Sequence, residues 1–193
     1  MGDDHTGIIV INPKQVECIR GRDAISLLSL DDVILDIAVN PDRGYAMSIR
    51  GIAREIALAF DLPFSDPVLK NPELSLTDAP GVVTPKIEAG ADFIALRTID
   101  SVDVSAVTPL WMVRRLQMAG MRSISLAVDI TNYIMLEYGQ PLHAFDSEKI
   151  AGTLRVRRAG KTKTLTTLDG NDHPLNENDL LIADDNEIGR AHV

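Results

Sequence analysis

Hydrophobic positions along the chain recur with the spacings of both strands and helices. The β-branched run at 33–39 and the apolar run at 93–99 are typical of strands. Between them, apolar residues at intervals of three or four positions predict a helix at 46–60 with one face toward a core. These apolar residues are Ile49, Ile52, Ile56 and Phe60.

The second half of the chain predicts two further helices and three further strands. Thr108 and Pro109 are typical of a helix start, with the hydroxyl as N-cap and the proline at the first helical position. This helix should run to Ala119, with Gly120 just beyond its end, and another should span 126–138. The strands are expected at 153–158, 163–168 and 180–183.

A proline-rich stretch separates these two halves. Five prolines between residues 63 and 85, with few large apolar side chains, predict a linker. The expected organisation is a small helical module at 1–62, its first 30 residues peripheral, then a linker at 63–85 and a second domain at 86–193. Helices and strands segregate without regular βαβ alternation, so the fold class is expected to be α+β with largely antiparallel strands.

The composition is that of a globular protein. The 193 residues are 45% hydrophobic and 24% charged, and no apolar run approaches the roughly 18 residues that a membrane-spanning helix needs. The single cysteine, Cys18, excludes an internal disulfide and a multi-cysteine zinc site. We therefore expect a reduced, cytoplasmic setting and no membrane partner.

The net charge of −9 is unevenly distributed. Residues 1–85 carry 7 basic and 13 acidic side chains, whereas residues 97–163 carry 10 basic and 6 acidic ones. An acidic chain is not a general binder of nucleic acid, because phosphates repel it. Any nucleic acid is therefore expected to bind the second half, through a local patch.

Polar side chains gather among large apolar ones at 127–146. Buried polar groups need partners, so this segment predicts either an internal hydrogen-bond network or the wall of a pocket. Asp129 and Asp146 are candidates for helix caps, and Thr131 and Asn132 for bonds to neighbouring carbonyls. His143 alone is more often a structural histidine than a catalytic one. The four histidines show no paired spacing, so no metal site is expected: His5, His143, His173 and His192.

The same segment resembles a known family. From Val128 to Asp146 the chain has every fixed letter of V-D-x-T-N-Y-x-M-L-E-x-x-Q-P-x-H-A-F-D. This run is similar to the beta subunits of bacterial phenylalanyl-tRNA synthetases, in the module that edits mischarged tRNA. Further segments that resemble the family lie at 39–43, 51–55, 108–116, 156–159, 167–170 and 179–183.

The resemblance implies hydrolysis of tyrosyl-tRNA(Phe). Tyrosine differs from phenylalanine by one hydroxyl, and a mainly apolar pocket rejects an added hydroxyl only about 10²-fold. A second site that hydrolyses the wrong ester is the physical answer, and tyrosine would be its ligand. A hydrogen bond to the hydroxyl would exclude phenylalanine, which leaves that partner unpaired at a cost of about 1–3 kcal/mol.

By resemblance, three residues line this editing pocket. His143 is expected to orient the attacking water or hold the terminal ribose, since its pKa near neutrality suits either task. Thr131 and Asn132 are expected to donate hydrogen bonds to the ester carbonyl as negative charge forms. Glu137 is expected to be structural.

The family resemblance also implies substrate-binding positions at Gln140, Ala191 and His192. The family continues its last strand with G-L-A-G-V-M-G-G, whereas this chain has Arg190 and His192 at two of those positions. A side chain at His192 would intrude on the space for the tyrosyl ring. The family's acidic residue that reads the tyrosine hydroxyl lies further along the subunit, so the editing domain is expected to be truncated at its C-terminal end.

The expected partners are the acceptor end of tRNA(Phe) and, in the full α2β2 enzyme, the alpha subunit. Four arginines are candidates for phosphate contacts, with a solvated surface as the alternative: Arg122, Arg155, Arg157 and Arg158. No cofactor is expected in this chain, whereas ATP and magnesium would serve the whole enzyme. The alternative function is a tRNA-binding or scaffold module without catalysis.

Overall fold

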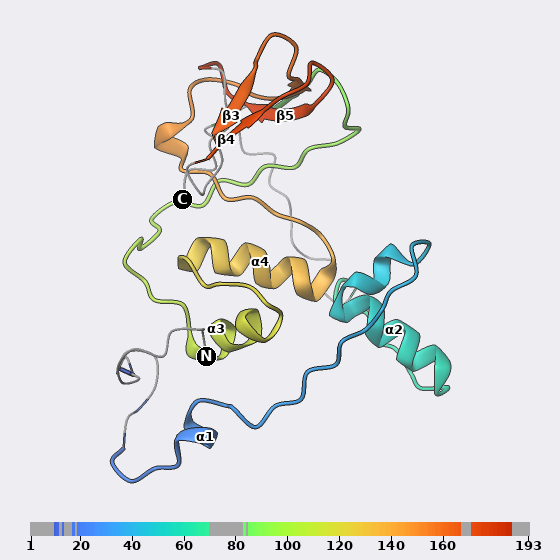
Figure 1. Cartoon of the computed structure of the whole chain (residues 1–193), viewed down its shortest axis with the longest axis vertical. Coiled ribbons are helices and arrows are strands. Elements are labelled where there is room, and N and C mark those ends of the chain that lie inside the picture. The colour runs from blue at the N-terminus through green and yellow to red at the C-terminus, as the bar shows by residue number, and fades with distance from the viewer. Residues whose placement is uncertain are drawn as a thin grey trace. The chain divides into compact units, whose positions relative to one another are not determined.

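The computed structural model describes residues 10, 11, 13, 17, 19–69, 83, 85–166 and 171–186. The chain forms two compact units, each built from two separate stretches (Figure 1). Unit 1 comprises Met1–Pro72 and Asp103–Leu142, and unit 2 comprises Glu73–Val102 and His143–Val193. The α+β class is confirmed. In the described part of the chain, no helix has the length and apolar character needed to cross a bilayer.

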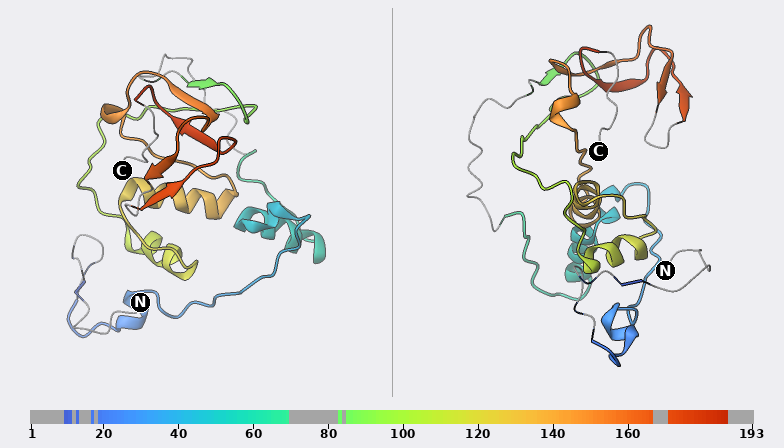
Figure 2. Two further views of the ribbon diagram at one scale, coloured as in Figure 1. Left: turned by 45° about the horizontal axis from the view of Figure 1, so that its top comes forward. Right: turned by 90° about the vertical axis from the view of Figure 1, so that its left-hand side faces the viewer.

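Unit 1 is helical. Its elements are α1 (Ala24–Leu27), the 3-10 helix η1 (Gly44–Met47), α2 (Ile49–Ala59), α3 (Leu110–Met118) and α4 (Leu126–Tyr138). The predicted helices at 46–60 and 126–138 are confirmed, and α4 has the predicted bounds. Figure 2 shows α3 beside α4 in both views, and the two helices pack against each other.

The packed face of α2 differs from the predicted one. Ile49 and Phe60 are 57% and 72% exposed, whereas Gly51 and Ala57 are buried. A Cβ on Gly51 would lie 1.9 Å from the carbonyl oxygen of Tyr45, so only glycine lets η1 approach this closely. The close approach of the backbones, rather than the apolar stripe, decides which face of α2 packs.

Two predicted strands are wrong. Neither 33–39 nor 93–99 forms a strand, and Leu35 and Phe93 are 75% and 80% exposed. A strand requires a neighbour for its backbone N–H and C=O groups, and β-branched composition alone does not supply one. No strand pairs with either run within the described residues.

The start of α3 is shifted by one residue from the prediction. Pro109 is the N-cap, and the hydroxyl of Thr108 instead donates a hydrogen bond to Asp129. The end is as predicted, because Gly120 follows the C-cap residue with a φ of +78°. Leu116 is completely buried and anchors α3.

The described residues of unit 2 form two small sheets. In the first, β2 (Leu154–Arg158) pairs parallel with β1 (Pro85–Ile87) and antiparallel with β5 (Leu180–Ala183). In the second, β3 (Thr164–Thr166) pairs antiparallel with β4 (Asp172–Pro174). The 3-10 helix η2 (Ser147–Lys149) precedes β2. The predicted strands at 153–158, 163–168 and 180–183 are found, although residues 167 and 168 lie outside the described part.

The core of unit 2 follows the alternation of its strands. Leu154 and Val156 are buried on β2, and Leu181 and Ala183 are buried on β5. Val156 pairs with Ile182, whereas Leu181 and Ala183 pair with Arg157 and Arg155. Because paired residues point to the same face of a sheet, Leu154 and Val156 are buried on one face and Leu181 and Ala183 on the other. Strand β5 forms part of the candidate site.

Candidate functional site

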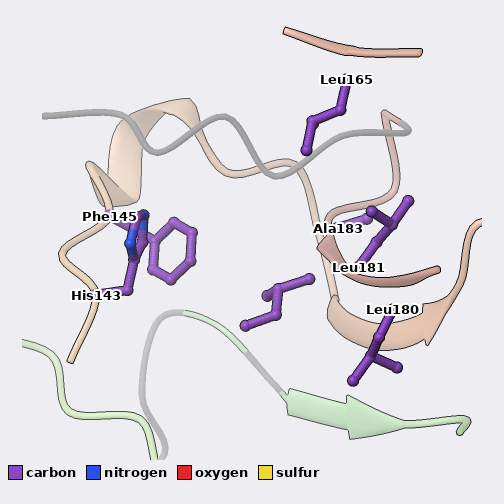
Figure 3. A pocket seen from close by; sticks show the side chains of 7 residues that line it. His143, Phe145, Leu165, Leu180, Leu181 and Ala183 are labelled. Atoms are coloured by element: carbon purple, nitrogen blue, oxygen red, sulfur yellow. The ribbon is translucent and has the colours of Figure 1, made fainter. Parts of the chain in front are cut away.

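An open pocket lies in unit 2 beside His143. Its volume is about 160 Å³. Figure 3 shows His143 and Phe145 side by side at one wall, with Leu181 and Ala183 at another and Leu165 at a third. The lining residues are His143, Phe145, Leu165, Leu180, Leu181, Ile182 and Ala183. The pocket is therefore mostly apolar, with one imidazole in its wall.

Local structure fixes the His143 wall. The rings of His143 and Phe145 lie 4.4 Å apart between centroids and are tilted by 58°. Asp146 then caps η2 by accepting a hydrogen bond of 3.1 Å from the backbone N–H of Glu148. The cap predicted for Asp146 is thus confirmed, and it anchors the chain directly after the aromatic ring.

The opposite wall depends on pairing between distant strands. Strand β5 pairs with β2, about 25 residues earlier in the chain, and all four residues of β5 are part of the lining. Leu165 comes from β3. The apolar wall therefore joins segments that the sequence alone did not connect.

The imidazole of His143 is partly removed from water. The residue is exposed, yet burial of its ring against the apolar wall lowers the pKa of His143 from its ordinary 6.5. No hydrogen bond engages His143 within the described residues. At pH 7 the ring is mainly neutral, so one nitrogen accepts a proton while the other donates a hydrogen bond.

Thr131 and Asn132 lie on α4, which belongs to unit 1, whereas His143 belongs to unit 2. The hydroxyl of Thr131 donates a hydrogen bond of 2.7 Å to the carbonyl of Val128 within the helix. This bond matches the alternative interpretation of Thr131. Asn132 is half-buried, and no hydrogen bond engages its amide in the described part of the chain.

The substrate-binding predictions fall elsewhere. Gln140 is exposed in unit 1, just beyond α4. Ala191 and His192 lie outside the described residues, as does the Gly189–Arg190 pair. One carboxylate oxygen of Glu137, Oε2, is buried with no hydrogen-bond partner among the described residues.

Asp129 is the structural centre of unit 1. Its side chain is completely buried, and Oδ2 accepts hydrogen bonds of 2.5 Å from the hydroxyls of Thr108 and Ser123. Oδ1 accepts a third bond, of 3.0 Å, from the backbone N–H of Ile124. Asp129 thereby ties α4 to the segments on both sides of α3, as a satisfied buried group rather than a reactive one.

Three of the four candidate arginines are engaged within unit 2. Arg155 bonds to Asp185 at 2.9 Å and to Glu88 at 3.1 Å, and these hydrogen bonds raise the pKa of the guanidinium. Arg157 donates to the carbonyls of Arg158 and Ala159. Arg158 donates to the carbonyl of Asn178 at 2.6 Å.

Arg122 differs from those three arginines. It is exposed in unit 1, and no ion pair or hydrogen bond holds it among the described residues. Across that same part of the chain, no group of three or more His, Cys, Asp or Glu side chains could hold a metal ion.

Sequence reasoning missed most of the pocket lining. Phe145 was part of the family run but received no role, and Leu165 and Leu181 were treated only as strand residues. The apolar run of β5 was a usable signal for a strand, but all four of its residues are apolar, so the sequence did not show which of them are buried. The strands β1 and β4 were also missed.

Comparison with known proteins identifies the family. Residues 90–193 match the B3/4 domain family. The phenylalanine–tRNA ligase beta subunit of Streptomyces avermitilis is 52% identical over 195 residues, covering 100% of this chain and 23% of that protein.

Two further relatives agree. The phenylalanine–tRNA ligase beta subunit of Thermobifida fusca is 47% identical over 183 residues, and that of Nocardia farcinica is 45% identical over 186 residues. These matches cover 95% and 96% of this chain, and 22% of each relative. The chain thus spans less than a quarter of the length of these relatives. It belongs to the B3/4 domain family and, along its whole length, is similar to phenylalanine–tRNA ligase beta subunits.

Proposed function

We propose that this chain is the part of a phenylalanine–tRNA ligase beta subunit that hydrolyses tyrosyl-tRNA(Phe). The observation that carries this proposal is the open apolar pocket with the His143 imidazole in its wall. Similarity to ligase beta subunits supports the tRNA substrate, and the B3/4 match covers the residues of the pocket.

The pocket suits an aromatic side chain. A cavity of about 150 Å³ lined by apolar residues holds a benzene-sized ring, and this pocket has about 160 Å³. Leu181 and Phe145 offer the ring apolar and aromatic contacts. The bound tyrosyl group would then carry its ester toward the open side, where water has access.

His143 is the proposed catalytic residue. Its neutral imidazole accepts a proton from the attacking water, whose oxygen bonds to the ester carbonyl carbon. The bond between that carbon and the ribose oxygen breaks, and the ribose oxygen takes the proton back from the imidazolium. The products are tyrosine and uncharged tRNA(Phe). The alternative task for His143 is to hold the terminal ribose.

The roles of the remaining site residues follow from the family resemblance. Asn132 is the better candidate donor to the ester carbonyl, because the hydroxyl hydrogen of Thr131 is used within α4. Gln140, Ala191 and His192 are proposed to contact the substrate. Arg122 is the candidate arginine best placed for tRNA phosphates, since its guanidinium is exposed.

The full enzyme supplies the rest of the proposed setting. We place this chain in a cytoplasmic α2β2 ligase, with the alpha subunit performing aminoacylation with ATP and magnesium. The ester produced there would be presented to the site described above. This chain's own contribution is to remove the wrong amino acid.

The test is deacylation of tyrosyl-tRNA(Phe) by the ligase holoenzyme whose beta subunit carries this chain. We expect His143→Ala to slow hydrolysis by about a hundredfold, as loss of a general base does. The matched control is His173→Ala, since His173 is exposed on β4 and does not line the pocket. Unchanged hydrolysis in His143→Ala would refute the catalytic role.

The second candidate is a scaffold or tRNA-binding module without catalysis. Two residues favour it. The Thr131 hydroxyl, expected to donate to the ester carbonyl, is bonded within α4, and Arg155, a candidate for phosphate contacts, is paired with Asp185. Titration of the chain with free tyrosine, followed by NMR, separates the two functions. Shifts at His143 and Phe145 support the editing site, and no shift at millimolar tyrosine supports the scaffold.

A further inference from the structure

An aromatic and cationic cluster lies on the paired helices α3 and α4 of unit 1. The rings of Trp111 and Tyr133 meet edge-to-face, with centroids 5.3 Å apart and an interplanar angle of 85°. The guanidinium carbon of Arg115 lies 5.5 Å from the Trp111 ring centroid and 6.0 Å from that of Tyr133. We call these three residues the Trp111 cluster.

The cluster is preorganised and half open. Arg115 donates a hydrogen bond of 2.8 Å from Nη1 to the Tyr133 hydroxyl, which fixes the guanidinium over the rings. Trp111 keeps 50% of its surface exposed, although it is the only tryptophan of the chain. One of the five N–H donors of Arg115 is used in this bond, so others are left for a ligand.

The charge around the cluster is positive. Residues 104–128 contain three arginines and no acidic residue, in a chain whose net charge is −9. Of the two acids of α4, Asp129 is completely buried. Glu137 is the one acid of α4 near the cluster: burial and the Glu137 carboxylate raise the pKa of the Tyr133 hydroxyl, so one negative charge stands against the three arginines. The surface beside Trp111 therefore attracts an anionic ligand.

A second cluster of one arginine and two aromatic rings in unit 1 has carboxylates beside it and serves as a comparison. Arg54 lies 5.8 Å from the ring centroid of Tyr45 and 5.9 Å from that of Phe64. There the Tyr45 hydroxyl donates to Glu55, and Asp66 pairs with Arg50. Carboxylates pair with arginines beside that cluster, whereas no ion pair holds Arg115 among the described residues. The carboxylate near the Trp111 cluster is that of Glu137, which acts on the Tyr133 hydroxyl.

We propose that the Trp111 cluster is a stacking platform for an unpaired nucleotide of RNA. The base stacks on the exposed indole, and the remaining donors of Arg115 bind the adjacent phosphate. Only an unpaired nucleotide offers both a free π-face and a phosphate within reach, because a duplex hides its base faces. The platform takes RNA as its partner from the proposed function, but it needs neither His143 nor hydrolysis.

The single tryptophan makes the platform directly observable. An eight-nucleotide oligo(A) RNA added to the chain at low salt should quench the emission of Trp111, since stacking on a base quenches indole fluorescence. A blunt RNA duplex of equal length should bind at least tenfold more weakly. Binding should weaken as salt rises, because arginine contacts to phosphate release counterions.

Variants test the two parts of the platform by anisotropy of labelled oligo(A). We expect Trp111→Leu to lose about tenfold in affinity, and Trp111→Phe to lose less because a ring remains. Arg115→Gln should lose about tenfold, and Arg115→Lys should retain part of the affinity through charge alone. The matched control is Arg54→Gln, which alters the same type of contact and should leave binding unchanged. Circular dichroism confirms that each variant is folded.

Several results would overturn the platform. They are unquenched emission at saturating oligo(A), equal affinity of Trp111→Leu and the parent chain, or equal binding of duplex and single strand. A Trp111 emission that changes with protein concentration and not with RNA would show that a second copy covers the cluster. His143→Ala should bind oligo(A) normally, so failure of hydrolysis and failure of the platform are separable.

Discussion

The two ends of one polar segment, 127–146, have different roles: one is structural, and the other lies beside the candidate site. At its start, Asp129 is buried in unit 1 and accepts three hydrogen bonds, so its carboxylate is fully engaged. At its end, His143 is exposed beside an apolar pocket in unit 2, and no hydrogen bond engages it among the described residues. A satisfied polar group builds the fold, and an unengaged one beside a cavity is available for chemistry.

The largest expected effect is at the Asp129 end. Asp129→Ala removes the acceptor shared by the buried Thr108 hydroxyl and by the part-buried Ser123 hydroxyl and Ile124 N–H, and a buried group that loses its acceptor costs about 1–3 kcal/mol. We expect the free energy of unfolding to fall by about 3–5 kcal/mol, measured by urea denaturation. The control is Asp146→Ala, which removes the cap of η2 and should cost about 1 kcal/mol. Equal losses of unfolding free energy in Asp129→Ala and Asp146→Ala would contradict a special structural role of Asp129.

At His143 we expect an effect on the pH dependence of hydrolysis, with little effect of substitution on the free energy of unfolding. Because the pKa of His143 is lowered from 6.5, the neutral imidazole dominates above pH 6.5. Hydrolysis of tyrosyl-tRNA(Phe) should be constant there and fall about tenfold per pH unit below the pKa of His143. The contribution of His143 to folding stability depends on pH in the same direction. Because its pKa is lower in the folded chain, that contribution is present above pH 6.5 and is lost as the pH falls through the pKa of the folded state.

The pH profile of the variant completes this test. His143→Ala should show a flat profile over the same range and an unfolding free energy within about 0.5 kcal/mol of the parent. A profile that still falls below pH 6.5 would assign the titration to another group.

A smaller effect is expected at Gly139, where the structural part of the segment ends. Gly139 caps α4 with a φ of +81°, and an added Cβ would lie 3.2 Å from Oγ of Ser48. Gly139→Ala should therefore cost about 1–2 kcal/mol of unfolding free energy, from the left-handed backbone conformation. Gly120→Ala is the matched control for the backbone effect alone, because nothing lies near its Cβ position. Equal losses at both glycines would exclude a contribution from Ser48.

The smallest effect is expected for Arg155→Gln. Its partners Glu88 and Asp185 are exposed, and exposed ion pairs contribute little to stability because water and salt screen them. The urea midpoint should move slightly at low salt and return to the parent value at 1 M salt. If the stability loss of Arg155→Gln persisted at 1 M salt, Arg155 would be a structural centre of its unit, as Asp129 is.

Local signals were sufficient for the elements that the chain specifies by itself. The bounds of α4 agree with the prediction because a glycine in the left-handed region ends the helix at Gly139. The strand β5 was predicted because its apolar residues are flanked by polar ones. Long-range pairing was not accessible in this way, so β1 was missed and 33–39 was wrongly predicted as a strand.

The candidate site shows the same division. His143 was found through the family run, whereas the wall formed by Leu181 and Ala183 depends on the pairing of β5 with β2. The packed face of α2 likewise depends on the backbone of Tyr45 approaching Gly51, which no hydrophobic pattern encodes. The engagement of Arg155 by distant acids was invisible for the same reason.

The interleaved order of the two units has a consequence for synthesis on the ribosome. Helix α2 packs against α4, and Pro85 of β1 pairs with Leu154 of β2, so each unit waits for a segment made much later. Neither unit can close while the nascent chain is half made, and contacts of such long sequence separation slow folding. Early segments with exposed apolar side chains, such as 33–37, would therefore be natural substrates for chaperones during translation.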